Sequence, residues 1–226
     1  MLLQIEENGL FMIFEVTENK PVQFLYFGAE PAKRELPSKP ELYSMMEIQA
    51  TGESRGEHWG VDPMGSFPGG RMNYVKHSDT RNETGRVLEF HTKDTVTGLS
   101  SHMTYQFYDG IPIVRCLHRI TNEGAEPIGL ELVTSFVQPA VADEQEETLS
   151  LLIPHNAWQE EIQWKETPVN QLGYHTFSDC GSSSKRIQIR SIGSWSAGEY
   201  LPLACLRNAT NETMEFWQIE HNGPWN

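Results

Sequence analysis

The sequence is poor in basic residues relative to acidic ones, and this shortage excludes two classes of partner. Its 226 residues include 17 Lys and Arg against 31 Asp and Glu, which gives a formal net charge of -14. Such a surplus of negative charge repels phosphate backbones and anionic lipid surfaces. We therefore expect neither nucleic acid nor a membrane as a partner, and a neutral ligand such as a sugar fits the charge better.

Long apolar runs and a cysteine framework are also missing. No run reaches the roughly 18 apolar residues that span a bilayer, because charges or turn residues interrupt each one. The N-terminus, MLLQIEENGLFMIFEV, has neither a basic start nor a small-residue cleavage site, so it does not resemble a secretory signal. Cys116, Cys180 and Cys205 are an odd number for disulfides. Free thiols in a reducing cytoplasm are the expected state.

Motifs for catalysis, phosphate binding and metal binding are absent as well. The chain has no Gly-x-Ser-x-Gly nucleophile elbow, and the glycine pair in SFPGGR lacks the strand, Lys-Ser/Thr ending and helix of a phosphate loop. None of the eight histidines forms a tight pair with a carboxylate on one helix, so we expect no zinc site and no cofactor. The many acids are scattered, and we assign no catalytic residue within the chain.

The chain is rich in alternating apolar and polar residues. Two such runs flank Asn8-Gly9, which is a strong signal for a tight hairpin, and the pattern recurs around Asp109-Gly110. Only residues 167–173 look helical, with a Thr cap, Pro at the first position and a Gly stop. We expect strands near 2–7, 10–16, 22–28, 43–49, 86–94, 99–108, 111–121, 127–138, 149–153, 158–166, 185–191, 201–206 and 213–220.

These strands predict an all-β fold, a large two-sheet antiparallel sandwich with very little helix. The pattern shows no repeat and no linker, so we expect a single domain over residues 1–226. The least regular stretches are 50–72 and 140–148, and irregular segments on a rigid sandwich are where binding groups usually lie.

The candidate substrate-binding residues are His58, Trp59 and Asp62, in the first of these stretches. An aromatic face beside hydrogen-bonding side chains is a common way to hold a sugar. A second interpretation is that Trp59 anchors its loop at the sandwich edge, and both stay open. For the other tryptophans, which lie on or next to expected strands, burial in a core or a domain interface is the default. His118 alternates with Cys116 on a strand and is expected to be hydrogen-bonded.

Several longer stretches resemble the N-terminal domain of family 36 α-galactosidases. They are HNAWQEE at 155–161 with the following QWKETPVNQLGYH, the segment from KRI at 185 through SIGSWSAGEYLPLACLRN, EFWQIEHNGPW at 215–225, and PIVRCLHRITNEGAEPIGLELVTSF at 112–136. The similarity covers most of residues 100–226, whereas the first hundred residues agree in pattern more than in motif.

The resemblance implies a β-supersandwich followed by a catalytic (β/α)8 barrel, and a retaining mechanism with two aspartates that lie in the barrel, beyond Asn226. It implies a chain that is the N-terminal part of a longer enzyme acting on α-galactosides, and the free thiols place the expected enzyme in the cytoplasm. In tetrameric members a loop of this domain reaches a neighbouring subunit's sugar pocket, and residues 52–62 match that loop in position. The amino-acid sequence of residues 52–62 departs from the commoner family pattern.

Two other functions stay open. A disaccharide phosphorylase also carries a sandwich before its catalytic part, and the motifs within 185–225 favour the galactosidase over it. A free-standing carbohydrate-binding module would expose an aromatic platform, which tryptophans scattered over strands do not suggest. The leading hypothesis is a noncatalytic domain that packs on a barrel and shapes its sugar pocket.

Overall fold

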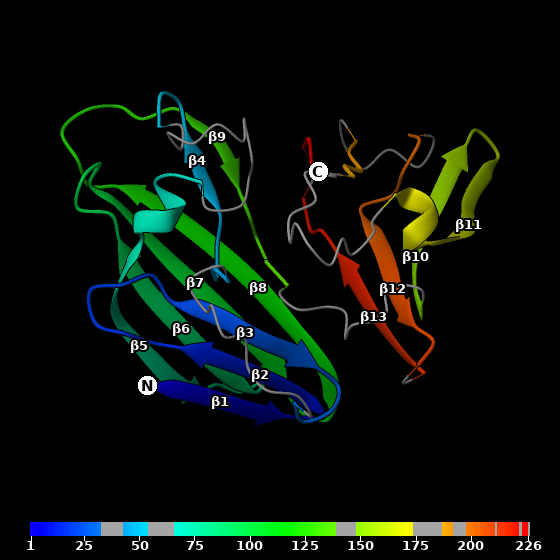
Figure 1. The fold of residues 1–226 in the computed structure, drawn as a ribbon, viewed down its shortest axis with the longest axis horizontal. Helices are drawn as coiled ribbons and strands as arrows, with labels where there is room; N and C mark the ends of the chain where they lie inside the picture. The colour runs from blue at the N-terminus through cyan, green and yellow to red at the C-terminus, as the bar shows by residue number, and fades with distance from the viewer. Residues whose placement is uncertain are drawn as a thin grey trace, which may run out of the picture. The chain divides into compact units, whose positions relative to one another are not determined.

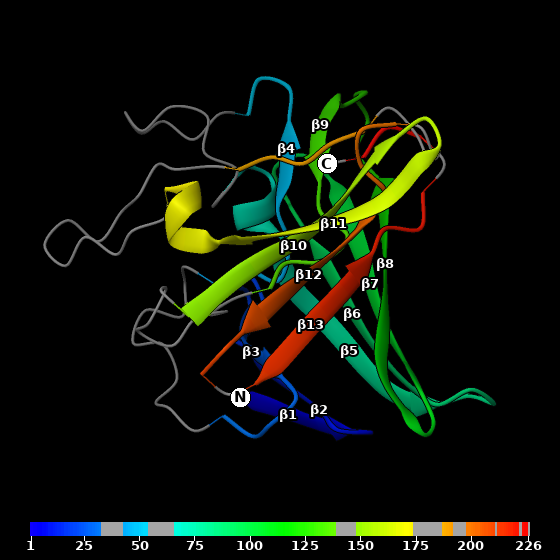
Figure 2. The same ribbon diagram turned by 90° about the vertical axis from the view of Figure 1, so that its right-hand side faces the viewer.

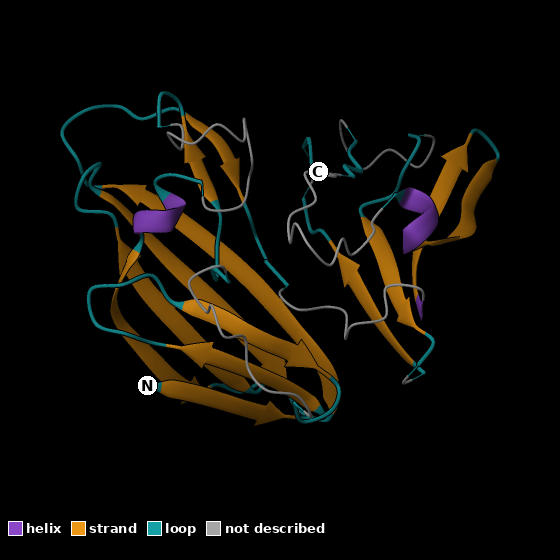
Figure 3. Cartoon of the chain, viewed as in Figure 1, coloured by secondary structure: helices purple, strands orange, loops and turns teal. Residues whose placement is uncertain are grey.

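The computed structural model describes residues 1–32, 43–53, 66–138, 148–173, 187–191, 198–210, 212–221 and 223–225. Within these ranges the chain forms antiparallel strands and a few turns of 3-10 helix (Figure 3). The prediction of an all-β, antiparallel fold with very little helix is confirmed. In the same ranges, no helix has the length and apolar character needed to cross a bilayer.

Contacts divide the chain into two compact units, Met1–Val141 and Ala142–Asn226. This division leaves the single domain over residues 1–226 a prediction. The first unit contains a three-stranded sheet, a four-stranded sheet and a two-stranded ribbon (Figure 1). Its strands are β1 (Leu2–Glu7), β2 (Leu10–Glu15), β3 (Gln23–Gly28), β4 (Ile48–Ala50), β5 (Asn73–Arg81), β6 (Arg86–Lys93), β7 (Leu99–Tyr108), β8 (Ile111–Asn122) and β9 (Leu130–Val133), with the 3-10 turn η2 (Gly69–Arg71) between β4 and β5.

The core of the first unit lies between the β1-β2-β3 sheet and the β5-β6-β7-β8 sheet. Alternation places one side chain in two on the inner face of each strand. Phe14 of β2 stacks on Phe24 of β3 with ring centroids 4.5 Å apart, and it also meets Phe90 of β6 at 5.0 Å. Such aromatic pairs add to the free energy gained by burying their area.

Turn chemistry sets the register of the first hairpin. Asn8 and Gly9 have φ values of 50° and 83°, so both central residues adopt the left-handed conformation that the Asn-Gly pair predicted. The pairing of Glu7 with Leu10 then fixes the alternation that buries Met12 and Phe14.

The second unit holds one four-stranded sheet in the order β11-β10-β12-β13 (Figure 2). Its strands are β10 (Leu149–Ala157), β11 (Glu160–Pro168), β12 (Leu203–Asn208) and β13 (Thr213–Gln218), and the 3-10 turn η4 (Val169–Leu172) follows β11. Gly173 ends η4 at a φ of 85°, as the predicted glycine stop requires, but the predicted Thr cap is wrong because Pro168 precedes the turn without a side-chain cap.

Several predicted strands differ from the structure. Residues 73–81 form β5, an edge strand with mostly exposed side chains, which the pattern did not predict. The strand expected over 127–138 shortens to β9, and the one over 43–49 to β4. Residues 187–191 carry a single bridge, from Ser191 to Trp225, in place of a strand. Pro154 does not end its strand, since β10 continues to Ala157.

Candidate functional site

The predicted substrate-binding residues His58, Trp59 and Asp62 lie outside the described residues, within 54–65. The structure therefore leaves their role a prediction. It does describe the two ends from which this segment departs, Glu53 and Ser66. Backbone pairing brings these ends together, because Ala50 N donates to Phe67 O at 3.0 Å and Gln49 bridges to Pro68.

An ion-pair network holds the first end. Arg71 donates from Nη1 to Glu53 Oε2 at 2.9 Å, and from Nε and Nη2 to the two oxygens of Asp94 at 3.2 and 3.0 Å. The guanidinium also lies 4.9 Å from the centre of the Phe67 ring, within cation-π range. The side chain of Asp94 is 1% exposed. A buried carboxylate with a bidentate arginine is among the stronger polar contacts in proteins.

Asp94 is stabilised in its charged form. Burial by itself raises the pKa of this carboxyl, but hydrogen bonds from Arg71, from the Thr97 hydroxyl and from Val96 N together lower it. The carboxylate also accepts from Thr97 N at 3.2 Å, and it thereby closes the turn between β6 and β7. The Glu53 end of the segment is thus tied to the four-stranded sheet through Arg71.

A second buried carboxylate holds the other end. Glu47 Oε2 accepts hydrogen bonds from Ser66 N at 3.0 Å and from Ser66 Oγ at 2.7 Å. The backbone of Glu47 pairs in turn with Thr134, whose N donates to Glu47 O at 3.0 Å. A side chain at Gly69 would bring Cβ to 2.6 Å from Ile48 N, so this close approach requires glycine.

His118 extends this network into the four-stranded sheet, and the predicted hydrogen-bonded strand histidine is confirmed. Its Nδ1 lies 2.7 Å from Thr134 O, and its Nε2 lies 2.6 Å from Ser101 Oγ. Because a carbonyl oxygen only accepts, Nδ1 carries the proton and Nε2 of the neutral ring accepts from the serine. Burial lowers the pKa of His118, and the bond to Thr134 offsets part of that shift.

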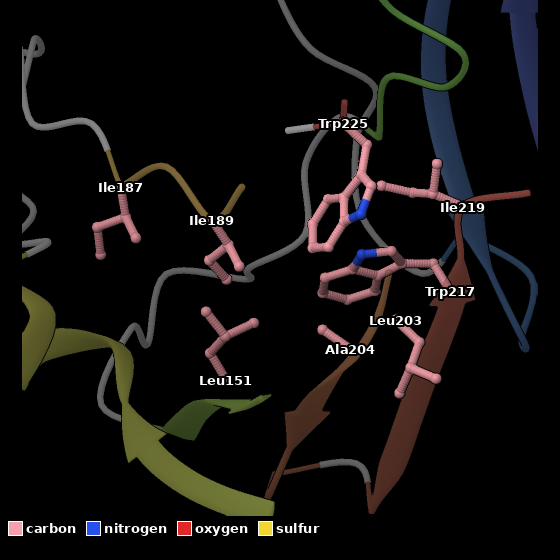
Figure 4. Close-up of a pocket in the computed structure, with 8 residues that line it drawn as sticks. All are labelled: Leu151, Ile187, Ile189, Leu203, Ala204, Trp217, Ile219 and Trp225. Atoms are coloured by element: carbon pink, nitrogen blue, oxygen red, sulfur yellow. The ribbon is translucent and has the colours of Figure 1, made fainter. Parts of the chain in front are cut away.

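The second unit contains an apolar groove of about 290 Å³ between its sheet and the segments that cross it (Figure 4). Trp225 is 9% exposed and Trp217 is 39% exposed, and their indoles lie next to each other at one end of the groove. The remaining lining residues are aliphatic: Leu151, Ile187, Ile189, Leu203, Ala204 and Ile219. Such a lining offers few hydrogen bonds to a sugar and is typical of a packing surface.

Known structures share this fold. The family 36 α-galactosidase AgaB from Geobacillus stearothermophilus matches with a TM-score of 0.65 and 12% identity over 98% of this chain and 33% of the other. The α-galactosidase from Lactobacillus brevis matches with a TM-score of 0.64 and 13% identity over 99% of this chain and 33% of the other. At such identities the likeness shows the fold alone, and the chain spans about a third of each enzyme. No curated protein sequence matches it.

The sequence itself decides the family. Residues 24–189 match the model of the glycosyl hydrolase family 36 N-terminal domain. The chain belongs to this family. The resemblance drawn from the motifs is confirmed, and the match begins well before residue 100, in strands where the sequence showed pattern but few motifs.

Sequence reasoning missed the residues that build the two ends of the 54–65 segment in this family 36 domain. Glu47, Arg71 and Asp94 belong to no motif that marks them as functional in the sequence. Charge alone gave no signal, because a buried and a solvated carboxylate look alike in a sequence. The signal available was the turn context, since Asp94 follows an alternating strand and precedes Thr97-Gly98, a pattern typical of a side chain that caps a turn.

Of the tryptophans for which burial in a core or a domain interface was expected, Trp225 is buried and Trp217 is 39% exposed. Trp158 is 73% exposed at the turn between β10 and β11, and Trp164 on β11 is 46% exposed. Trp195 lies outside the described residues. Across the described ranges, no group of three or more His, Cys, Asp or Glu side chains is arranged to hold a metal ion.

Proposed function

We propose that this chain is the noncatalytic N-terminal domain of a longer retaining α-galactosidase-type glycoside hydrolase. Membership of the family 36 N-terminal domain family carries the proposal, together with the chain's span of about a third of the matched enzymes. The two aspartates of the retaining mechanism would then lie in a catalytic barrel outside these residues. The α-galactoside is the substrate of that whole enzyme, and the cytoplasm is its proposed location.

Two exposed apolar side chains on one sheet face of the second unit, Met214 and Phe216, support packing on that barrel. Cys205 pairs with Phe216 on one side and with Leu152 on the other, so these three side chains share a face. Phe216 is 58% exposed and Met214 is 56% exposed on the same face. Exposed aromatic and sulfur-containing side chains on adjacent strand positions are typical of an interface, and contacts between domains bury about 600–1,500 Å².

The construction around residues 54–65 supports a role in shaping the sugar pocket. Two buried carboxylates, Asp94 and Glu47, fix the ends of the segment, so any group it carries is attached to a rigid base. His58, Trp59 and Asp62 would supply a stacking face and hydrogen bonds to the sugar, in the same subunit or in a neighbouring one of a homo-oligomer. Loops that bind substrate are commonly carried in this way by a rigid scaffold.

An activity assay tests the noncatalytic role. The purified 226-residue chain should release no nitrophenol from a nitrophenyl α-galactoside, whereas the full-length protein should turn it over. Turnover by the chain alone at an enzyme-like rate, of order 1 s⁻¹ or faster, would place catalytic carboxylates within these residues and contradict the proposal.

Replacing Trp59 with Ala in the full-length protein tests the pocket-shaping role. Loss of one stacking contact, about 1 kcal/mol, should lower kcat/KM several-fold while the fold is kept. Trp164→Ala, on a strand of the second unit, is the matched control and should leave kcat/KM near that of the parent protein. Unchanged kinetics in Trp59→Ala, or unfolding of that variant, would favour the loop-anchor interpretation instead.

A further inference from the structure

The turn between β10 and β11 presents an unusually exposed indole. Ala157 pairs with Glu160, so Trp158 and Gln159 form a two-residue loop, and Trp158 is 73% exposed. No other described tryptophan is as exposed; the next is Trp164, at 46%. A single exposed apolar side chain needs no explanation by itself, so the case depends on how the turn is built.

The backbone of this hairpin is strained. Ile162 has a φ of 60°, and Gln159 has a φ of 63°. A β-branched residue in the left-handed region is an outlier that costs about 1–3 kcal/mol and persists only where its surroundings impose it. Such residues gather at ligand sites, where a fixed shape is needed.

Two hydrogen bonds impose the shape. Ile162 N donates to Asn156 Oδ1 at 2.7 Å, and Asn156 N donates to Glu199 O at 2.9 Å. Asn156 Nδ2 is buried and has no hydrogen-bond partner among the described residues, which adds a cost. The ladder shifts register between His155 and Ala157, and such bulges commonly re-aim side chains. The tip is therefore held in one shape at the expense of stability.

The chemistry around the indole indicates the kind of ligand. The side chains that follow Trp158 are Gln159, Glu160 and Glu161, all exposed hydrogen-bonding groups. These three residues provide no apolar anchor, and the next exposed apolar side chains of the hairpin, Ile162 and Trp164, lie further along β11. An exposed indole followed in the chain by carboxylates suits a single pyranose ring, whose C–H face stacks while its hydroxyls donate to carboxylates. The two carboxylates repel anionic sugars.

We propose that the β10–β11 turn, through Trp158, is a surface binding site for a neutral pyranoside. It belongs to the second unit and is separate in sequence from residues 54–65, so it goes beyond the proposed function. A site of one aromatic ring gives weak binding, with a dissociation constant on the order of 1 mM. Such a site would hold the enzyme near an oligosaccharide without taking part in its hydrolysis.

Proton-nitrogen NMR of the tryptophan indoles in the 226-residue chain tests this site, with raffinose as the probe. The Trp158 Nε1–H signal should shift and saturate together with the backbone amide signals of the turn, and in Trp158→Ala the backbone amide signals of the turn should no longer shift. Trp164→Ala, on the same hairpin, is the matched control and should bind within about twofold of the parent chain. Trp158→Gln, with a polar side chain suited to an exposed turn, repeats the test should the alanine variant prove unstable.

A second titration compares a neutral with an anionic monosaccharide, methyl α-galactoside against galacturonate. The neutral sugar should have the lower dissociation constant, and Glu160→Gln should reduce the difference between the dissociation constants of the two sugars. No shift of the Trp158 signal at about ten times the expected dissociation constant would overturn the site. A shift of the turn's backbone amide signals that is equally large in Trp158→Ala would also overturn the site. A response confined to Trp59 would also overturn it while leaving the proposed role of residues 54–65 intact, so the two proposals fail separately.

Discussion

Arg71 donates two parallel hydrogen bonds to Asp94, from Nε to Oδ1 at 3.2 Å and from Nη2 to Oδ2 at 3.0 Å. This pair joins the turn after β6 to the base of the 54–65 segment, since Arg71 also bonds Glu53. One guanidinium thus links the β5-β6-β7-β8 sheet to the base of the segment that carries the candidate sugar-binding residues.

Replacing Arg71 with Ala should lower the free energy of unfolding of the first unit by about 3 kcal/mol. The reason is that Asp94, 1% exposed, would be left as an unpaired buried charge. Urea unfolding followed by far-ultraviolet circular dichroism measures the change. Arg81→Ala is the control, because Arg81 and its partner Asp109 are both more than half exposed, and its other partner, Glu7, would keep an ion pair with Arg86, so the loss should be small. Equal effects of the two substitutions would show that the Asp94 pair is not a stabilising anchor.

The stability of the first unit should fall as the pH drops from 7.5 to 5.5. His118 is half-buried and neutral, and its partial burial lowers its pKa, so the unfolded chain binds its proton at higher pH than the folded one does. The stabilising contribution is complete above the unfolded pKa of about 6.5 and is lost as the pH falls through the folded value. The pKa of His91 is also lowered, by burial and by the neighbouring His102, so His91 likewise makes the folded state less stable as the pH falls.

Chemical unfolding at a series of pH values checks this dependence. The slope of unfolding free energy against pH should decrease in His118→Asn, which removes the titrating ring, although that variant should be less stable at every pH. An equal slope in the parent chain and in the variant would assign the pH dependence to other groups.

Cys116 should be unreactive in the folded chain. Burial raises the pKa of its thiol to about 12, so at pH 8 only about one molecule in ten thousand carries the thiolate that reacts. Treatment with iodoacetamide followed by peptide mass spectrometry should find Cys116 unmodified in the native protein and modified in guanidinium chloride. Rapid native labelling would mean that β8 opens locally on the timescale of the reaction.

Part of this fold could be predicted from residue patterns, and the reasons differ by element. Asn8-Gly9 set its hairpin because both residues tolerate positive φ, and the strands on either side alternate cleanly. β5 was missed because most of its side chains are exposed on both faces, so its sequence shows no alternation of apolar and polar residues. The strand expected near 149–153 is longer in the structure, because β10 continues through Pro154, which pairs with Trp164 of β11.

The site was harder to predict than the fold. Composition and irregularity directed attention to residues 50–72, and Arg71 lies there, but its partner Asp94 is more than twenty residues away in the sequence. The pairing depends on how β4, η2 and the β6–β7 turn meet in space, which a single sequence does not specify. Trp158 was expected at the start of a strand near 158–166, but it lies in the two-residue turn before β11, where its side chain is exposed.

Replacing Ile162 with Gly should raise the free energy of unfolding of the second unit by about 1 kcal/mol. Ile162 has a φ of 60°, a conformation that costs an L-residue roughly 1–2 kcal/mol and costs glycine almost nothing. The isoleucine side chain is 53% exposed, so its removal forfeits only part of a buried side chain's contribution. Glycine also increases the entropy of the unfolded chain, which offsets some of the relief.

Urea unfolding followed by tryptophan fluorescence measures the change. Ile153→Gly, on the neighbouring strand β10 with φ below zero, is the control and should destabilise the second unit. A loss of stability in Ile162→Gly as large as in the control would show that the left-handed backbone at this position is not strained.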